Sequence, residues 1–238
     1  MQQNIALNNS IVCFIDFLGM RNAIECNSAK TLVTIKEIYT NALTRCNNDI
    51  KDLFRYPIKA KIFSDNIILA CEIIDNDDKS AHTLQCLCKI IHLAKYIQIC
   101  AIQKNFLIRG AITIGDFYLD DTMVWGNALV DTYYLENNIA IFPRIILSKH
   151  IMDTWQKYAG LDFPNQITNL AIYSDEDGIH FINYLKSYGR GYEGIMQTIK
   201  TSYMVFSNRY KSEKDVKVKQ KYAWHLSYLN RCLLECEM

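Results

Sequence analysis

Two strand-like runs, residues 58–63 and 67–74, are separated only by Ser64, Asp65 and Asn66. Both runs are mostly apolar, and the three residues between them are of the polar types that favour turns. This spacing predicts a tight β-hairpin with a polar tip, which requires that part of the sheet be antiparallel. Asp65 lies at the tip of that hairpin.

The segments around the hairpin alternate between strand and helix patterns. Residues 11–16 form a short apolar run that ends in Asp16, and residues of about 28–55 carry a helical periodicity that stops at Pro57. A helix at 80–103, a strand at 106–114, a helix at 127–137 and a strand at 141–147 are expected to follow. This order predicts an α/β sandwich of the α+β kind, in which a mixed, mainly antiparallel sheet carries helices on one face.

The last third of the chain predicts a short hairpin from residues 171–173 and 179–184, and then helices at 195–211 and 215–236. No change of composition separates these helices from the rest. We therefore expect residues 1–238 to form a single domain, with a core at about 10–150 and a helical C-terminal extension at about 170–236. A basic run at 211–221 is interrupted by Glu213 and Asp215, which favours a solvated helix face over a phosphate groove.

The charge balance narrows the choice of partners. The chain has 26 Lys and Arg against 25 Asp and Glu, and this near-neutral balance argues against a nucleic-acid partner. No apolar run approaches the roughly 20 residues of a membrane span, and residues 1–9 lack the pattern of a signal peptide. The nine cysteines lack the spacing of a zinc site. We expect a cytoplasmic protein with reduced cysteines and no direct membrane contact.

Two carboxylates occupy positions that would be costly in a core. Asp16 follows a strand-like run, and Asp65 lies at the tip of an apolar hairpin. If the two strands are neighbours in the sheet, these carboxylates converge and, together with a turn of free backbone amides, can bind hard divalent cations that carry phosphates. Each aspartate taken alone is more often a turn or cap residue.

Four segments in chain order make the sequence resemble a known family. They are residues 14–20 (FIDFLGM), 59–65 (KAKIFSD), 109–115 (RGAITIG) and 124–136 (VWGNALVDTYYLE). The series resembles the catalytic domain of class III nucleotidyl cyclases, and its details look closest to the pyrimidine cyclases of Pycsar anti-phage systems. The resemblance covers about residues 10–150, and Pro143, Arg144 and Ile145 also suit that branch.

The resemblance implies roles for individual residues. Asp16 and Asp65 would bind two Mg²⁺ or Mn²⁺ ions, and Arg109 would contact phosphates, with a sheet-edge ion pair as the alternative. The backbone amides of the turn before the first helix would cradle phosphate oxygens; they belong to Phe17, Leu18, Gly19 and Met20. Lys61 resembles the base-contacting lysine of adenylyl cyclases. Tyr56 would line a pyrimidine pocket or else pack in the core.

The sequence also departs from the wider superfamily. Mammalian-type cyclases place an Asn and an Arg on the helix after the Trp-Gly pair, where this chain has Val130 and Tyr134. Another cation must then meet the charge that develops on the α-phosphate. Arg144 is the candidate for this catalytic role, and structural packing is its alternative.

The resemblance implies a uridylate or cytidylate cyclase. It would convert UTP, or as the alternative CTP, to the 3′,5′-cyclic monophosphate and pyrophosphate, and the product would act on a separate effector in anti-phage defence. The family forms its sites between two chains, so a homodimer is implied, in which residues 120–136 complete the partner's site. The alternative is a catalytically inactive nucleotide-binding regulatory module on the same fold, which Val130 and Tyr134 favour.

Overall fold

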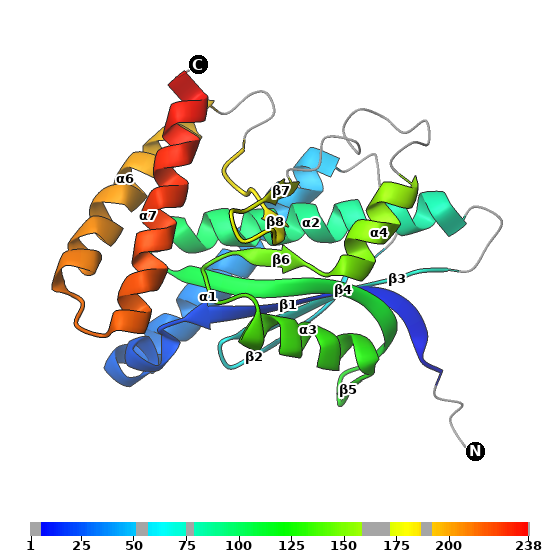
Figure 1. The fold of residues 1–238 in the computed structure, drawn as a ribbon. Coiled ribbons are helices and arrows are strands. Elements are labelled where there is room, and N and C mark those ends of the chain that lie inside the picture. Colours follow the sequence, from blue (N-terminus) through cyan, green and yellow to red (C-terminus); the bar gives the residue numbers. More distant parts are fainter. Residues whose placement is uncertain (1–5, 51–56, 75–78, 159–171, 187–191, 238) are drawn as a thin grey trace.

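The computed structural model describes residues 6–50, 57–74, 79–158, 172–186 and 192–237. Its centre is an eight-stranded sheet with the order β2-β3-β1-β4-β6-β8-β7, and β5 pairs with β4 (Figure 1). The strands are β1 (Asn8–Leu18), β2 (Lys59–Phe63), β3 (Asn66–Glu72), β4 (Leu107–Leu119), β5 (Val124–Trp125), β6 (Ile145–Leu147), β7 (Ile172–Ser174) and β8 (His180–Ile182). Only β4 and β6 run parallel, which confirms a mixed, mainly antiparallel sheet.

The helices are α1 (Met20–Ile50), α2 (Lys79–Gln103), α3 (Asn127–Asn138), α4 (Lys149–Tyr158), α6 (Tyr192–Ser212) and α7 (Val216–Glu237). The first helix begins earlier than the periodicity indicates, and Asn27 interrupts it with φ −162° and ψ 88°. The predicted C-terminal hairpin and helix pair are confirmed as β7–β8 and α6–α7. The strand expected at 141–147 is shorter, because pairing with β4 begins only at Ile145.

Helices cover both faces of the sheet, whereas the sequence pattern placed them on one. The larger core lies between the sheet and α1, α2 and α4, and Ile11, Cys13 and Ile15 of β1 point into it. The alternate residues Val12 and Phe14 face the other side, where α3 packs on them. Since both faces are covered, the central strands are apolar along almost their whole length.

The long helix α2 is apolar on nearly all sides. Its length and composition would allow it to cross a membrane, yet 72% of its most apolar stretch is buried in the fold. A helix that packs on the sheet and on α1 needs no polar face there, so α2 is the core helix of this fold.

The structure describes the side chains of eight of the nine cysteines, and these eight form no disulfide, as expected. Seven of the eight are buried, and Cys26 is exposed. Burial raises the pKa of the Cys13 thiol, which lies on β1 near the chemistry considered below. Cys13 is therefore an inert packing residue.

Candidate functional site

Three strand ends meet at one end of the sheet and bring the two predicted carboxylates together. Asp16 of β1 lies opposite Asn66 of β3 on one side and opposite Arg109 of β4 on the other. The turn at Ser64 and Asp65 then folds against β1, where the Phe17 amide donates a hydrogen bond to the Asp65 carbonyl oxygen at 3.0 Å. The expected convergence of Asp16 and the hairpin tip is thus the arrangement that the structure has.

Arg109 holds the Asp16 carboxylate in place. Its Nε lies 3.3 Å from Asp16 Oδ2 and 2.6 Å from Oε1 of Glu136, which reaches the site from α3. Arg109 and Asp16 are 17% and 20% exposed and Glu136 only 2%, so these charges interact with little screening by water. The ion pair expected as the alternative role of Arg109 is present, and its partner is the proposed metal ligand itself.

The positive charges near the carboxylates of this cluster do not fully offset the effect of burial on their pKa values. Burial raises the pKa of Asp16; Arg109 opposes that rise, and Asp65 adds to it. Burial also raises the pKa of Glu136 to about 7, against the opposing effect of Arg109. One guanidinium therefore does not neutralise the carboxylates around it, and an added cation would stabilise their ionised forms.

The two aspartates are suitable ligands for a divalent metal ion. Among the described residues, Asp16 Oδ2 contacts Arg109 and Asp65 Oδ1 accepts a hydrogen bond from Asn66, so each carboxylate keeps one oxygen without a protein partner. Oxygen ligands of this kind suit Mg²⁺ and Mn²⁺. No group of three or more His, Cys, Asp or Glu side chains in the described ranges forms a complete metal site, so further ligands would have to come from a substrate or from water.

The turn after β1 meets the expectation for a phosphate cradle only in part. Gly19 has φ +74°, a conformation that glycine adopts without strain, and α1 begins at the next residue, Met20. The first backbone N–H groups of a helix lack intrahelical partners, so Gly19 and Met20 remain suitable. The amides of Phe17 and Leu18 lie in the β1–β4 pairing, and that of Phe17 also bonds to Asp65, which makes them poorer candidates.

Of the two residues expected at the base pocket, Lys61 and Tyr56, the structure describes only Lys61. The Lys61 Nζ donates to the backbone carbonyl oxygens of Asp120 and Asp121, in the loop before β5. It also lines an apolar groove of about 590 Å³ between the hairpin and α3, together with Phe63, Val124, Val130 and Tyr133, among others. Tyr56 lies outside the described residues.

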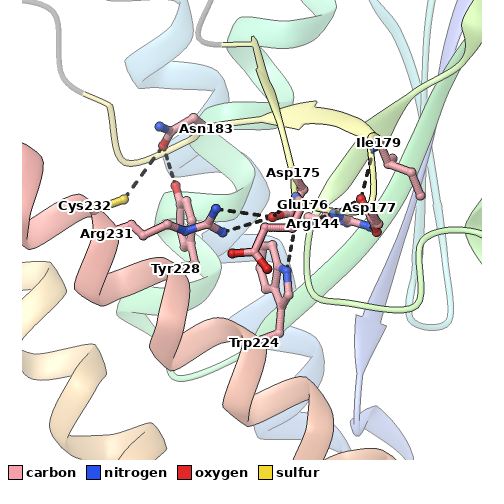
Figure 2. Close-up of polar contacts among 10 residues, drawn as sticks. All are labelled: Arg144, Asp175, Glu176, Asp177, Ile179, Asn183, Trp224, Tyr228, Arg231 and Cys232. Carbon is pink, nitrogen blue, oxygen red and sulfur yellow. Dashed lines mark hydrogen bonds and ion pairs between the residues drawn. The ribbon is translucent and has the colours of Figure 1, made fainter.

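The structure does not bring Arg144 to the carboxylate pair, which corrects the expectation of a catalytic role. Its side chain is 1% exposed and forms ion pairs with Asp175 and Asp177 of the β7–β8 turn. Its guanidinium also lies 5.6 Å from the ring centre of Trp224 on α7 (Figure 2). Arg144 thus joins β6, the hairpin and the last helix, which is the packing alternative considered from the sequence.

Sequence reasoning missed two members of the cluster. Glu136 belongs to a recognised segment, but only the packing of α3 on β1 and β4 shows that it reaches Arg109. Lys221 belongs to the basic run at 211–221, and its charge acts on both Asp16 and Glu136. Helical spacing places Glu136 on the same side of α3 as the buried Thr132 and Ala128. This spacing is the one feature of the sequence that indicates a buried position for Glu136.

No protein-family model matches the sequence, and no curated protein matches it. Among solved structures, the adenylyl cyclase CyaB from P. aeruginosa is 14% identical, with a TM-score of 0.47 over 78% of this chain and 97% of that one. A monomeric guanylyl cyclase domain from the aquatic fungus Blastocladiella emersonii is 11% identical, with a TM-score of 0.46 over 74% and 95%. An adenylate/guanylate cyclase/hydrolase from Silicibacter pomeroyi is 16% identical, with a TM-score of 0.44 over 75% and 98%. These TM-scores lie below 0.5, so the case for a function depends on the geometry of the site and on the motifs.

Proposed function

We propose that this protein is a nucleotidyl cyclase that forms a 3′,5′-cyclic monophosphate and pyrophosphate from a nucleoside triphosphate. The observation that carries the proposal is the meeting of Asp16 and Asp65 at one end of the sheet, each with an oxygen free among the described residues, beside the Gly19 turn. The four cyclase-like segments support the same reaction. From the resemblance to the Pycsar branch, the proposed substrate is UTP, with CTP as the alternative.

In this mechanism Asp16 and Asp65 would hold two Mg²⁺ or Mn²⁺ ions. Bound there, such ions would lower the pKa of the ribose 3′-hydroxyl and neutralise the departing pyrophosphate. The 3′-oxygen forms a bond to the α-phosphorus and gives up its proton to water, while the bond between that phosphorus and the bridging oxygen to the β-phosphate breaks and pyrophosphate leaves with that oxygen. Arg109 fixes the orientation of Asp16 through the ion pair, and Gly19 and Met20 offer amides to phosphate oxygens.

The proposal includes a homodimer in which the exposed side chains of residues 120–136 reach the partner's site, while Glu136 stays with Arg109 of its own chain. In support, the surface around α3 and β5 is apolar and exposed: Val130 is 65% and Trp125 is 65% exposed, and Tyr133 and Tyr134 are also exposed. Two of these side chains, Val130 and Tyr133, also line the groove between the hairpin and α3. Exposed apolar patches rimmed by polar residues mark interaction surfaces, and a second copy is the partner that the resemblance implies.

Val130→Glu is expected to weaken the homodimer at least about a hundredfold, because an unpaired carboxylate would be buried at the interface. Sedimentation or light scattering across a concentration series measures this change. The matched control is Val33→Glu on α1, where the valine is also exposed at 54% and lies away from α3. Wild type that is monomeric at all concentrations, or equal dimerisation of both variants, would contradict the proposed interface.

Incubation with Mn²⁺ and each of the four nucleoside triphosphates tests the reaction and the base preference together. We expect the cyclic monophosphate of a pyrimidine, separated by chromatography and identified by mass. Cyclic AMP alone would contradict the pyrimidine proposal. Nucleotide binding without any cyclic product would favour the inactive regulatory module, which the replacement of the usual Asn and Arg by Val130 and Tyr134 also favours.

The proposed biological role is second-messenger synthesis in the cytoplasm during phage infection. The cyclic product would diffuse to a separate effector, such as a membrane-spanning or TIR-domain protein. The support for this part is the resemblance of the four segments to Pycsar cyclases. Expression with and without phage challenge, followed by measurement of cyclic UMP and cyclic CMP, tests it.

A further inference from the structure

A small cavity lies where the helical extension meets the end of the sheet that carries Asp16. Its volume is about 70 Å³. The lining comes from the end of β1 and the turn after it, from β4 and from the helix pair, and consists of Leu18, Gly19, Leu107, Arg209, Val218, Lys221 and Tyr222. Two cationic side chains, Arg209 of α6 and Lys221 of α7, thus line the same cavity as Gly19 of the turn proposed to bind phosphate oxygens. Figure 1 shows this helix pair standing beside the end of β1.

Lys221 is a cation without an ion-pair partner among the described residues. It is half-buried, and burial together with the charge of Arg109 lowers its pKa, while Asp16 and Glu136 raise it. Its charge is therefore felt at the carboxylate cluster, although it forms no direct pair there. Lys217, one turn earlier on α7, is exposed.

A buried network fixes the part of α7 that carries Lys221. The residues at helical spacing after it face the same way and are tied to the rest of the fold. Trp224 donates to Asp175 Oδ2 at 2.8 Å, Tyr228 donates to Asn183 Oδ1 at 2.7 Å, and Arg231 lies 3.3 Å from Asp175 (Figure 2). Arg144 completes the network from β6. The position of Lys221 is therefore set by packing.

We propose that Lys221 binds the terminal phosphates of the nucleoside triphosphate, so that the C-terminal helices form part of the nucleotide site. This inference rests on the proposed function of that site. A lysine ammonium is a compact point charge that suits phosphate oxygens. Bound metal ions would sit on Asp16 and Asp65; Lys221 lines the same cavity as Gly19 of the turn that follows Asp16, and its charge acts on Asp16. Lys221 is half-buried, which departs from the solvated helix face expected for the basic run at 211–221.

Lys221→Met tests the inference, because methionine keeps much of the aliphatic stem and removes the charge. The probe is inorganic tripolyphosphate with Mn²⁺, titrated by calorimetry into the full chain. We expect affinity for the probe to fall by about 10- to 100-fold, as for the loss of one hydrogen bond between charged groups. The KM for the nucleotide should rise by a similar factor with a smaller change in kcat. Lys221→Arg should restore most of the binding, and Lys217→Met should bind as wild type does.

Several outcomes would overturn the inference. Wild type that does not bind tripolyphosphate, Lys221→Met that binds it as tightly as wild type, or Lys221→Met with a higher turnover would each do so. Thermal melting of the variants shows whether a loss reflects unfolding, and if Lys221→Met does not fold, Lys221→Gln takes its place. If wild type makes no cyclic nucleotide but binds tripolyphosphate through Lys221, the cyclase proposal fails and this inference stands.

Discussion

Asp65→Asn is expected to lower the turnover of cyclic nucleotide about a thousandfold while the fold stays intact. The amide loses the charge and one of the oxygen ligands that would hold a divalent ion, and a loss of that size corresponds to ~4 kcal/mol of transition-state stabilisation. Asp65 lies in a two-residue turn, and the contact that ties the turn to β1 uses its backbone oxygen, which the substitution keeps. Steady-state assays with Mn²⁺, together with thermal melting, measure both effects.

Asp65→Asn is a cleaner test than Asp16→Asn. Asp16 also pairs with Arg109 in a half-buried site, so its replacement would disturb the fold as well as the reaction. Asp153→Asn is the matched control, because Asp153 is exposed on α4 and, within the part of the chain that the structure describes, its ion pair is with Lys149 at the surface. Turnover by Asp65→Asn within tenfold of wild type would show that this carboxylate does not hold a metal ion needed for the reaction.

Arg144→Ala is expected to reduce the free energy of unfolding by about 3–5 kcal/mol. The substitution removes the closest ion pair of the buried Asp175, which keeps its contacts with Arg231 and Trp224, and it leaves Asp177 without its Arg144 partner; breaking a buried pair in this way has a cost of this size. It also removes the guanidinium packed against the Phe142 and Trp224 rings, which helps to hold α7 on the sheet. Urea unfolding followed by circular dichroism gives the difference.

The comparison for Arg144 is Arg21→Ala, whose partner Glu25 lies on the same exposed helix surface. Pairs of that kind contribute about 0–1 kcal/mol, so this variant should unfold nearly as wild type does. If Arg144→Ala unfolds within 1 kcal/mol of wild type, as a surface pair would, the structural role is refuted. If it stays folded in the cold but loses turnover while nucleotide affinity is kept, the catalytic role expected from the sequence would return.

Local patterns were enough to predict the sheet and the two aspartates. The apolar run that ends in Asp16 and the polar hairpin tip at Asp65 are short-range signals, and antiparallel pairing of neighbouring strands then brings them together. The same reasoning predicted the second hairpin and the helix pair α6–α7. It could not place α3 on the opposite face, because the strands of a sheet covered on both sides are apolar at every position.

The surroundings of Arg144 and Lys221 are set by contacts between distant parts of the chain. From the sequence, Arg144 is a candidate for catalysis. In the structure its side chain is bound by Asp175 and Asp177, which lie more than 30 residues further along the chain. Lys221 looked like a surface residue because the run around it is hydrophilic, while its environment is set by the docking of α7. The pattern of charges along a helix shows which face of that helix is polar. Which other elements that face contacts depends on the tertiary packing.

The most direct test of the cyclase account measures both products of one reaction. Wild type and Asp65→Asn are incubated with Mn²⁺ and UTP, and the cyclic monophosphate and pyrophosphate are quantified by chromatography in the same samples; CTP, ATP and GTP are run in parallel. The account predicts equal amounts of cyclic nucleotide and pyrophosphate from wild type with a pyrimidine triphosphate, and almost none from the variant. Release of phosphate with UDP, release of pyrophosphate with linear UMP, or no product from any of the four triphosphates would contradict it.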